Sequence, residues 1–238
     1  MRLLLSLLLL VGVACTTAPA PVPSPMPSIL PGPGPTANAV PYLALGDSYT
    51  IGEGAAATDR WPMQLAVLDR MQGGRLADPD IIARTGWTTA ELQGAIAASG
   101  NHRTDYGLVS LLIGVNNQYR GQSLATYRTE FRQLLSTAIA YAGGASGRVV
   151  VLSIPDWGQT PFAHGRDLAQ IAREIDDFNA VAQDECKSAG VAFVPITDLT
   201  RSAAGDASQF TTDGLHYTGP HMARWAARAL PVVQKLLQ

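Results

Sequence analysis

The sequence predicts an α/β fold, in which a parallel sheet carries helices on both of its faces. Five short apolar runs lack the polar alternation of a strand with one face in water, which is typical of parallel strands covered on both faces. The segments between these runs carry apolar residues at helical spacing. Because strand and helix alternate, we expect a doubly wound sheet. Its expected strands are 41–45, 80–83, 107–114, 148–154 and 191–196.

Signals for helix ends support this order of elements. Ser123 is a candidate N-cap for a helix with an apolar stripe over residues 124–139. Residues 88–91 fit the capping box T-x-x-E, so another helix is expected to start there. A third stripe runs over 168–182, and Gly190 is placed to end that helix in the left-handed conformation.

A single folded domain is expected over residues 40–238. The chain of 238 residues is 47% hydrophobic and 15% charged, which is enough material for one buried core. Its last segment, 219–238, is predicted to be a helix that is kinked or interrupted at Pro231. The formal net charge is −2 and no cluster of Lys or Arg is visible, so we expect no nucleic-acid partner.

The N-terminal segment is expected to lie outside that domain. Residues 1–15 combine a short basic start with an apolar run of about a dozen residues, which fits a signal peptide and is short for a spanning helix. Small residues lead into Cys15 as in the lipobox of bacterial lipoproteins, and an ordinary secretory signal cut near 18–20 is the alternative. Residues 16–39 are rich in proline, which is typical of an extended linker. We therefore expect an exported protein, periplasmic or a lipoprotein of the outer membrane or cell surface, tethered to the membrane if Cys15 is lipidated.

Cys186 is expected to be a small core residue.

Polar residues of chemical interest follow the first three predicted strands and precede the last helix. Since ligands of such sheets bind at the carboxyl ends of the strands, these residues are expected to meet at one edge. A serine nucleophile needs a base, a carboxylate that orients the base, and donors for the developing oxyanion. Ser48, His216 and Asp213 can fill the first three roles. The backbone N–H groups of Ser48 and Gly86 and the side-chain amide of Asn116 are the candidate oxyanion donors.

These motifs resemble those of the SGNH hydrolase superfamily, the GDSL-type esterases and lipases, over the whole predicted domain. The matching stretches are GDSYTIGEG, the glycine after the second strand, GVNN and DGLH, and the residues that carry over are Ser48, Gly86, Asn116, Asp213 and His216. The resemblance implies a flavodoxin-like three-layer α/β/α sandwich and two-step acyl transfer through the serine, without a cofactor. One departure is Asn117, which stands where the family usually has Asp. We expect it to alter loop bonding and substrate preference but to leave catalysis intact.

Several side chains near these loops are candidates for the substrate pocket. They are Trp87, Asn117, Tyr119, Trp157 and Phe162, and ordinary packing is the alternative for each aromatic ring. No long apolar lid segment is visible, which favours short-acyl or carbohydrate esters as substrates. A lipolytic acylhydrolase or lysophospholipase stays open, as does a non-catalytic envelope binding module on the same fold.

Other chemistries match the sequence less well. Residues 52–57 fit the dinucleotide fingerprint G-x-G-x-x-A, but they begin several residues after the predicted strand instead of at its end. The G-x-S-x-G motif of α/β-hydrolases does not fit residues 46–50. His216 and His221 with Asp213 lack the spacing of a zinc site. We therefore expect neither a bound metal nor a nucleotide.

Overall fold

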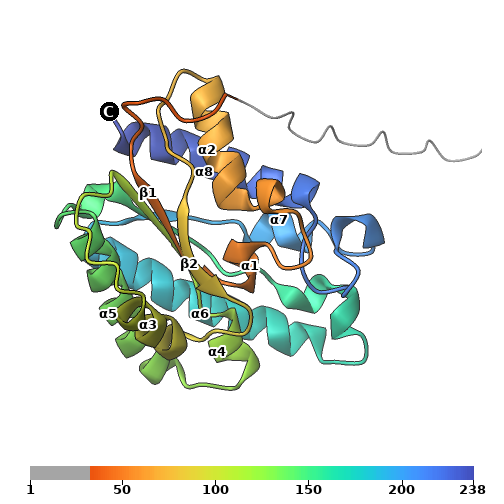
Figure 1. Ribbon diagram of the computed structural model, residues 1–238. Coiled ribbons are helices and arrows are strands. Elements are labelled where there is room, and N and C mark those ends of the chain that lie inside the picture. The colour runs from red at the N-terminus through yellow and green to blue at the C-terminus, as the bar shows by residue number, and fades with distance from the viewer. Residues whose placement is uncertain (1–32) are drawn as a thin grey trace, which may run out of the picture.

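The computed structural model describes residues 33–238, which form an α/β domain (Figure 1). Its five-stranded sheet has the order β2-β1-β3-β4-β5, and all neighbouring strands are parallel. The predicted α/β fold with a five-stranded parallel sheet is confirmed. The strands are β1 (Tyr42–Asp47), β2 (Asp80–Arg84), β3 (Leu108–Leu112), β4 (Val149–Leu152) and β5 (Ala192–Val194). The expected signal peptide over 1–15, Cys15 and most of the linker over 16–39 lie outside the described residues.

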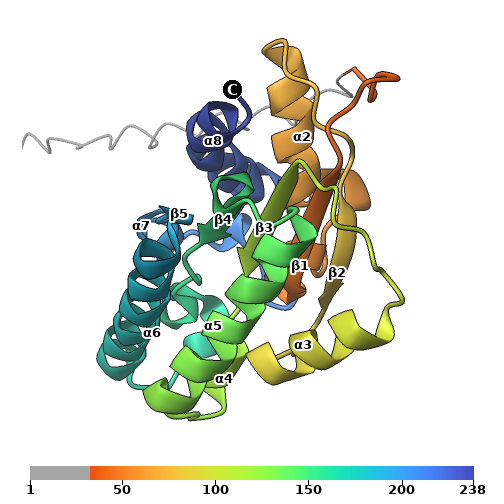
Figure 2. The ribbon, with the colours of Figure 1, turned by 90° about the vertical axis from the view of Figure 1, so that its left-hand side faces the viewer.

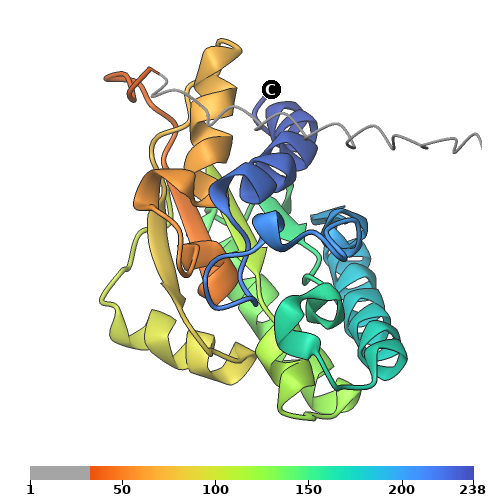
Figure 3. The same cartoon turned by 90° about the vertical axis from the view of Figure 1, so that its right-hand side faces the viewer.

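Helices cover both faces of the sheet and complete three layers. Figure 2 shows α3, α5 and α6 together on one face, and Figure 3 shows α2 and α8 side by side on the other. The helices are α1 (Ser48–Ile51), α2 (Trp61–Met71), α3 (Thr89–Ala98), α4 (Val115–Tyr119), α5 (Leu124–Tyr141), α6 (Leu168–Ala189), α7 (Thr197–Arg201) and α8 (Gly219–Leu236). Short 3-10 turns lie at Ala57–Asp59, Ser146–Arg148, Trp157–Gln159, Pro161–Ala163 and Ala207–Gln209.

The strands differ in how deeply they are buried. All residues of β1, β3 and β4 are buried, as expected for strands covered on both faces. The expectation is wrong for β2, whose ends Asp80 and Arg84 are exposed and whose middle is half-buried. The physical reason is its place at the edge of the sheet, where it pairs only with β1, for example Leu43 with Asp80. β5 forms the opposite edge and is also only partly buried.

The predicted helix ends are largely confirmed. The Ser123 hydroxyl accepts a hydrogen bond from the Thr126 N–H at the start of α5. Thr88 and Glu91 form the reciprocal capping box of α3. Gly190 ends α6 with a φ of 68°. The predicted interruption at Pro231 is wrong, since α8 continues past it as one helix. Pro231 is exposed, so the backbone carbonyl that loses its usual partner there lies toward water.

The core lies on both sides of β1, β3 and β4 and joins the two helical layers. Cys186 is fully buried in α6, as expected for a small core residue, and burial raises the pKa of its thiol to about 12. None of the helices within residues 33–238 is both long and apolar enough to cross a membrane.

Candidate active site

The turn between β1 and α1 sets the position of Ser48. A Cβ atom on Gly46 would lie 2.5 Å from the carbonyl oxygen of Leu112, so only glycine allows β1 to lie this close to β3. Asp47 caps α1, because its Oδ1 accepts from the Tyr49 N–H at 3.0 Å. Ser48 is thereby fixed as the first residue of α1, at the carboxyl end of a central strand, and is only 4% exposed.

The turn before α8 holds the His216 ring against Asp213. Asp213 Oδ2 lies 2.5 Å from His216 Nδ1. Asp213 Oδ1 accepts from the backbone N–H groups of Leu215 at 2.8 Å and His216 at 2.9 Å, and from the Thr211 hydroxyl at 2.9 Å. Partial burial raises the pKa of Asp213, but these donors outweigh it and hold the pKa well below its usual range. The carboxylate is therefore charged at neutral pH, and its contact with Nδ1 orients the ring so that Nε2 is turned away from Asp213.

These two turns border one cavity of about 170 Å³ at the carboxyl ends of the strands. Within residues 33–238 the structure records no hydrogen bond between the Ser48 hydroxyl and the His216 ring. The cavity is lined by Ser48, Tyr49, Thr85, Gly86, Val115, Asn116, Tyr119, Trp157, Phe162, Leu215 and His216. The five residues expected to carry chemistry thus converge. Four of them line the cavity, and the fifth, Asp213, contacts the His216 ring.

The two expected oxyanion donors outside the serine turn are held by their neighbours. Gly86 has a φ of 85°, a conformation that favours glycine, and its carbonyl accepts from Arg120 Nη2 at 2.6 Å. Glu91 holds the same guanidinium at 3.2 Å. The half-buried amide of Asn116 donates to the carbonyl of Trp87 at 2.9 Å and reaches the Asp47 carboxylate at 3.4 Å. These contacts fix both groups at the rim of the cavity.

The carboxylate of Asp47 lies directly behind the serine. Its side chain is fully buried, and burial raises its pKa to about 7, although the Tyr49 N–H and the Asn116 amide act in the opposite direction. No sequence motif could have revealed this shift, because it depends on how the turn is covered and not on the residues beside it.

Two of the expected pocket residues lie elsewhere. The Asn117 side chain is fully buried away from the cavity. Its Oδ1 accepts from the Thr89 N–H at 3.1 Å, and its Nδ2 donates to the Thr89 hydroxyl at 2.6 Å and to Gln122. An ionised Asp could accept from that N–H but could not donate to Thr89 or Gln122. Trp87 also does not line the cavity, because its ring packs against the core while its carbonyl accepts from Asn116.

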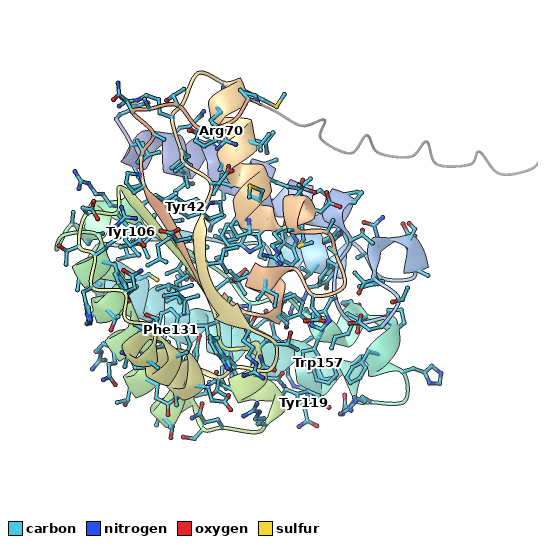
Figure 4. All side chains as sticks on the ribbon, viewed as in Figure 1. Tyr42, Arg70, Tyr106, Tyr119, Phe131 and Trp157 are labelled. Atoms are coloured by element: carbon cyan, nitrogen blue, oxygen red, sulfur yellow. The ribbon has the colours of Figure 1, made fainter. Side chains whose placement is uncertain are left out.

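The remaining expected residues form an aromatic wall, defined here as Tyr119, Trp157 and Phe162. The ring centroids of Tyr119 and Trp157 lie 5.3 Å apart, and those of Trp157 and Phe162 lie 6.1 Å apart. Figure 4 shows Tyr119 and Trp157 together, beyond the carboxyl ends of the strands. The Trp157 indole donates to Gln118 at 2.7 Å, which fixes this buried ring. Tyr119 and Phe162 are exposed and offer apolar surface at the mouth.

Five further residues of this region were not among those expected from the sequence. Tyr49, Thr85 and Val115 stand next to motif residues, and Leu215 stands next to the base, so adjacency alone could have indicated them. Arg166, which lies over the aromatic wall, gives no sequence signal because it is a single arginine in a loop. Within the described part of the chain, no group of three or more His, Cys, Asp or Glu side chains is arranged to hold a metal ion.

Residues 44–220 match the GDSL-like Lipase/Acylhydrolase family. No curated protein matches the chain significantly. Three similar solved structures share the fold. The crystal structure of TesA is 20% identical, covers 82% of this chain and 99% of its own, and has a TM-score of 0.64. The psychrotrophic esterase EstA from Pseudoalteromonas sp., inhibited by monoethylphosphonate, is 15% identical, with coverages of 82% and 97% and a TM-score of 0.63. A mutant of Axe2, an acetyl-xylooligosaccharide esterase from Geobacillus, is 16% identical, with coverages of 84% and 95% and a TM-score of 0.61.

Proposed function

The chain belongs to the GDSL-like lipase/acylhydrolase family and is a carboxylic ester hydrolase, and on that premise we propose that it cleaves short-acyl or carbohydrate esters through an acyl-enzyme on Ser48. The observation that carries the proposal is the 2.5 Å contact of His216 with Asp213 at a cavity that Ser48 also lines. A base held by a charged carboxylate beside a serine is the arrangement that activates a hydroxyl as a nucleophile.

In the proposed reaction, the Ser48 oxygen attacks the ester carbonyl while His216 Nε2 takes the hydroxyl proton. Asp213 stabilises the imidazolium that forms and stays ionised itself. His216 then gives the proton to the leaving alkoxide, and the acyl group remains on Ser48. A water molecule, deprotonated by the same ring, releases the acid and restores the serine. Catalytic hydrogen bonds often close only around substrate, so the first step requires Ser48 and His216 to come within bonding distance.

The negative charge that develops on the carbonyl oxygen needs donors already in place. We assign this role to the backbone N–H groups of Ser48 and Gly86 and to the Asn116 amide. The hold of Arg120 on the Gly86 carbonyl and of the Trp87 carbonyl on Asn116 supports the assignment, because both fix a donor before substrate arrives. Asn116 has two amide hydrogens, and the long 3.4 Å contact with Asp47 is the weaker one to exchange for the substrate oxygen.

The size of the cavity supports a small acyl group. About 170 Å³ holds five or six groups of the size of a water molecule, at ~30 Å³ each. That suits acetyl to butyryl groups, whereas a palmitoyl chain would have to extend past the aromatic wall. The fold-level neighbour named as an acetyl-xylooligosaccharide esterase agrees with this choice of substrate class, although at that identity it carries only the fold.

The location remains part of the proposal. Residues 1–15, with Cys15, support export and lipidation, and 16–39 would then span from the membrane to the domain. Metabolic labelling with an alkyne fatty acid in an expressing bacterium should mark the wild-type chain and spare Cys15→Ala. Equal labelling of both chains, or of neither, would contradict lipidation at this residue.

Hydrolysis of p-nitrophenyl esters from acetate to palmitate tests the reaction, with wild-type protein and Ser48→Ala side by side. We expect turnover that is greatest for acetate to butyrate and falls to the background rate in the variant. A folded Ser48→Ala protein that hydrolyses these esters as the wild type does would overturn the role of Ser48. A rate that rises with chain length up to palmitate would instead support a lipolytic acylhydrolase.

A further inference from the structure

Arg166 covers the aromatic wall at the mouth of the cavity. Its guanidinium carbon lies 5.4 Å from the ring centroid of Tyr119, 5.3 Å from that of Trp157 and 5.4 Å from that of Phe162. One guanidinium nitrogen donates to the Tyr119 hydroxyl at 3.3 Å. Arg166 is exposed, so the contact with three rings holds the side chain in place while its charge stays accessible from the mouth.

The charge of Arg166 is not balanced by an ion pair in the described part of the chain. Within residues 33–238 no carboxylate lies within ion-pair distance of Arg166, whereas Arg120, the other arginine near the cavity, is held by Glu91 and by the Gly86 carbonyl. The adjacent Asp167 makes no ion pair with it, and its carboxylate caps α6 by accepting from the Gln170 N–H at 2.9 Å. Arg166 therefore keeps donors that a ligand can use.

Arg166 is not among the residues that line the cavity of Ser48, but the three rings beneath it are. Arg166 lines a second cavity of about 600 Å³, whose walls include residues 158–161, His164 and Ala207. The carboxylate that lines this cavity, Asp206, accepts hydrogen bonds from Ser208 and Gln209. A substrate that places its ester carbonyl beside Ser48 and extends past the aromatic wall comes within reach of the guanidinium.

A carboxylate lies beside the first cavity on the side of β2. Glu53 accepts a hydrogen bond from Thr85, which lines the first cavity on the side of β2. A negatively charged substituent is repelled by Glu53 and attracted by the guanidinium of Arg166 at the aromatic wall. A neutral substrate gains nothing from this arrangement, whereas an anionic one is oriented by it.

We propose that Arg166 is a specificity-determining residue that binds a carboxylate or phosphate group of the substrate, so that the preferred substrates are anionic esters. The proposal rests on the esterase function proposed above and narrows its substrate class. A guanidinium binds such groups with two parallel hydrogen bonds, which an ammonium cannot reproduce. The anionic group can belong to the acyl part or to the alcohol part of the ester.

Two pairs of esters distinguish an anionic group in the acyl part from one in the alcohol part. The acyl pair is p-nitrophenyl hemisuccinate and its methyl ester, and the alcohol pair is p-acetoxybenzoate and its methyl ester. The measurement is kcat/KM for the anionic member divided by kcat/KM for the neutral member. The full-length wild-type chain is compared with Arg166→Gln, which removes the charge, and with Arg166→Lys, which keeps it.

Arg103→Gln is the matched control, because Arg103 also lies over a tyrosine ring, at 4.3 Å from Tyr106, and is remote from the cavity. We expect Arg166→Gln to lower the anionic-to-neutral ratio about ten-fold in one of the two pairs. Arg166→Lys should recover part of it, Arg103→Gln should leave it unchanged, and added salt should weaken the wild-type preference.

An unchanged ratio in both pairs would overturn the inference, and so would an equal loss on the anionic and neutral members, which is the result for a residue that only supports the rings. Either result leaves the proposed function standing if Ser48→Ala abolishes hydrolysis of the neutral esters. Hydrolysis of these esters that does not depend on Ser48 would instead overturn the proposed function, and this inference with it.

Discussion

Two aspartates flank the candidate site, and their surroundings give them opposite character. The side chain of Asp213 is 41% exposed and accepts from four donors, which hold its pKa far below the usual range. Asp47 is fully buried, accepts from the Tyr49 N–H and more weakly from Asn116, and has a pKa raised to about 7.

The comparison shows that burial and the number of donors decide what a carboxylate can do. Asp213 keeps its charge and can stabilise a positive imidazolium on His216. Burial raises the pKa of Asp47 to about 7, so a permanent charge there is costly; this residue caps α1 and contacts Asn116. Two aspartates on turns that border the same cavity thus have different roles: Asp213 stabilises a positive charge, and Asp47 holds the geometry of its turn.

The largest expected effect comes from removing the charge of Asp213. Asp213→Asn should lower kcat on p-nitrophenyl acetate by about 10³- to 10⁴-fold, because an amide neither stabilises the imidazolium nor fixes the productive tautomer. Steady-state kinetics on folded protein measures this. Asp198→Asn, which removes a carboxylate paired with Arg228 away from the cavity, is the control. Retention of a tenth or more of wild-type kcat would exclude the charged role given to Asp213.

A smaller loss is expected at the residue that touches Asp47 from the cavity side. Asn116→Ala should lower kcat by about 10²-fold with little change in KM, because it removes a donor that acts on the oxyanion and not on the ground-state carbonyl. The free energy of unfolding is measured in parallel to separate lost turnover from lost structure. Unchanged turnover in the folded variant would remove Asn116 from the oxyanion hole.

The raised pKa of Asp47 predicts how stability depends on pH. The folded state holds this proton more tightly than the unfolded state, so the contribution of Asp47 is fully present below its unfolded pKa near 4 and is lost as pH rises through about 7. Asp47→Asn keeps an acceptor for the Tyr49 N–H and removes the titration. From pH 5 to pH 8 its stability relative to wild type should therefore rise by about 2 to 3 kcal/mol. Urea unfolding curves at both pH values measure this, and a difference that stays constant with pH would contradict the raised pKa.

The smallest effect is expected from removing one of the hydrogen-bond donors to Asp213. Thr211→Val removes one of the four and leaves the ring contact intact, so kcat should fall by no more than about five-fold. Thr211→Ser, which keeps the hydroxyl, is the matched control and should stay close to wild type. A loss in Thr211→Val as large as that in Asp213→Asn would mean that the hydroxyl, and not the set of donors, holds the carboxylate.

The sequence predicted the elements whose signal is local. The apolar runs, the capping box at Thr88 and the left-handed end at Gly190 depend on neighbours in the chain, and the structure has them where they were expected. Sheet topology then placed Ser48, Gly86 and Asn116 on one edge, so the outline of the candidate site also followed from the sequence.

The rest depends on contacts between distant segments, which a single sequence does not carry. The edge position of β2 exposes its ends, because the order of strands in space decides burial. Asn117 follows Asn116 directly, yet one step along α4 turns its side chain from the cavity to Thr89. Arg166 becomes significant only because α4 and the turns at 157–163 place three rings beneath it.

Covalent labelling tests the central claim, that His216 and Asp213 activate Ser48. Wild-type protein, Asp213→Asn and Ser48→Ala would be treated with an ethyl fluorophosphonate, and the modified peptide identified by mass spectrometry. We expect one adduct on Ser48 in the wild type, labelling slowed by about 10³-fold or more in Asp213→Asn, and none in Ser48→Ala. A folded wild-type chain that stays unlabelled, or that is labelled equally fast in Asp213→Asn, would contradict the account.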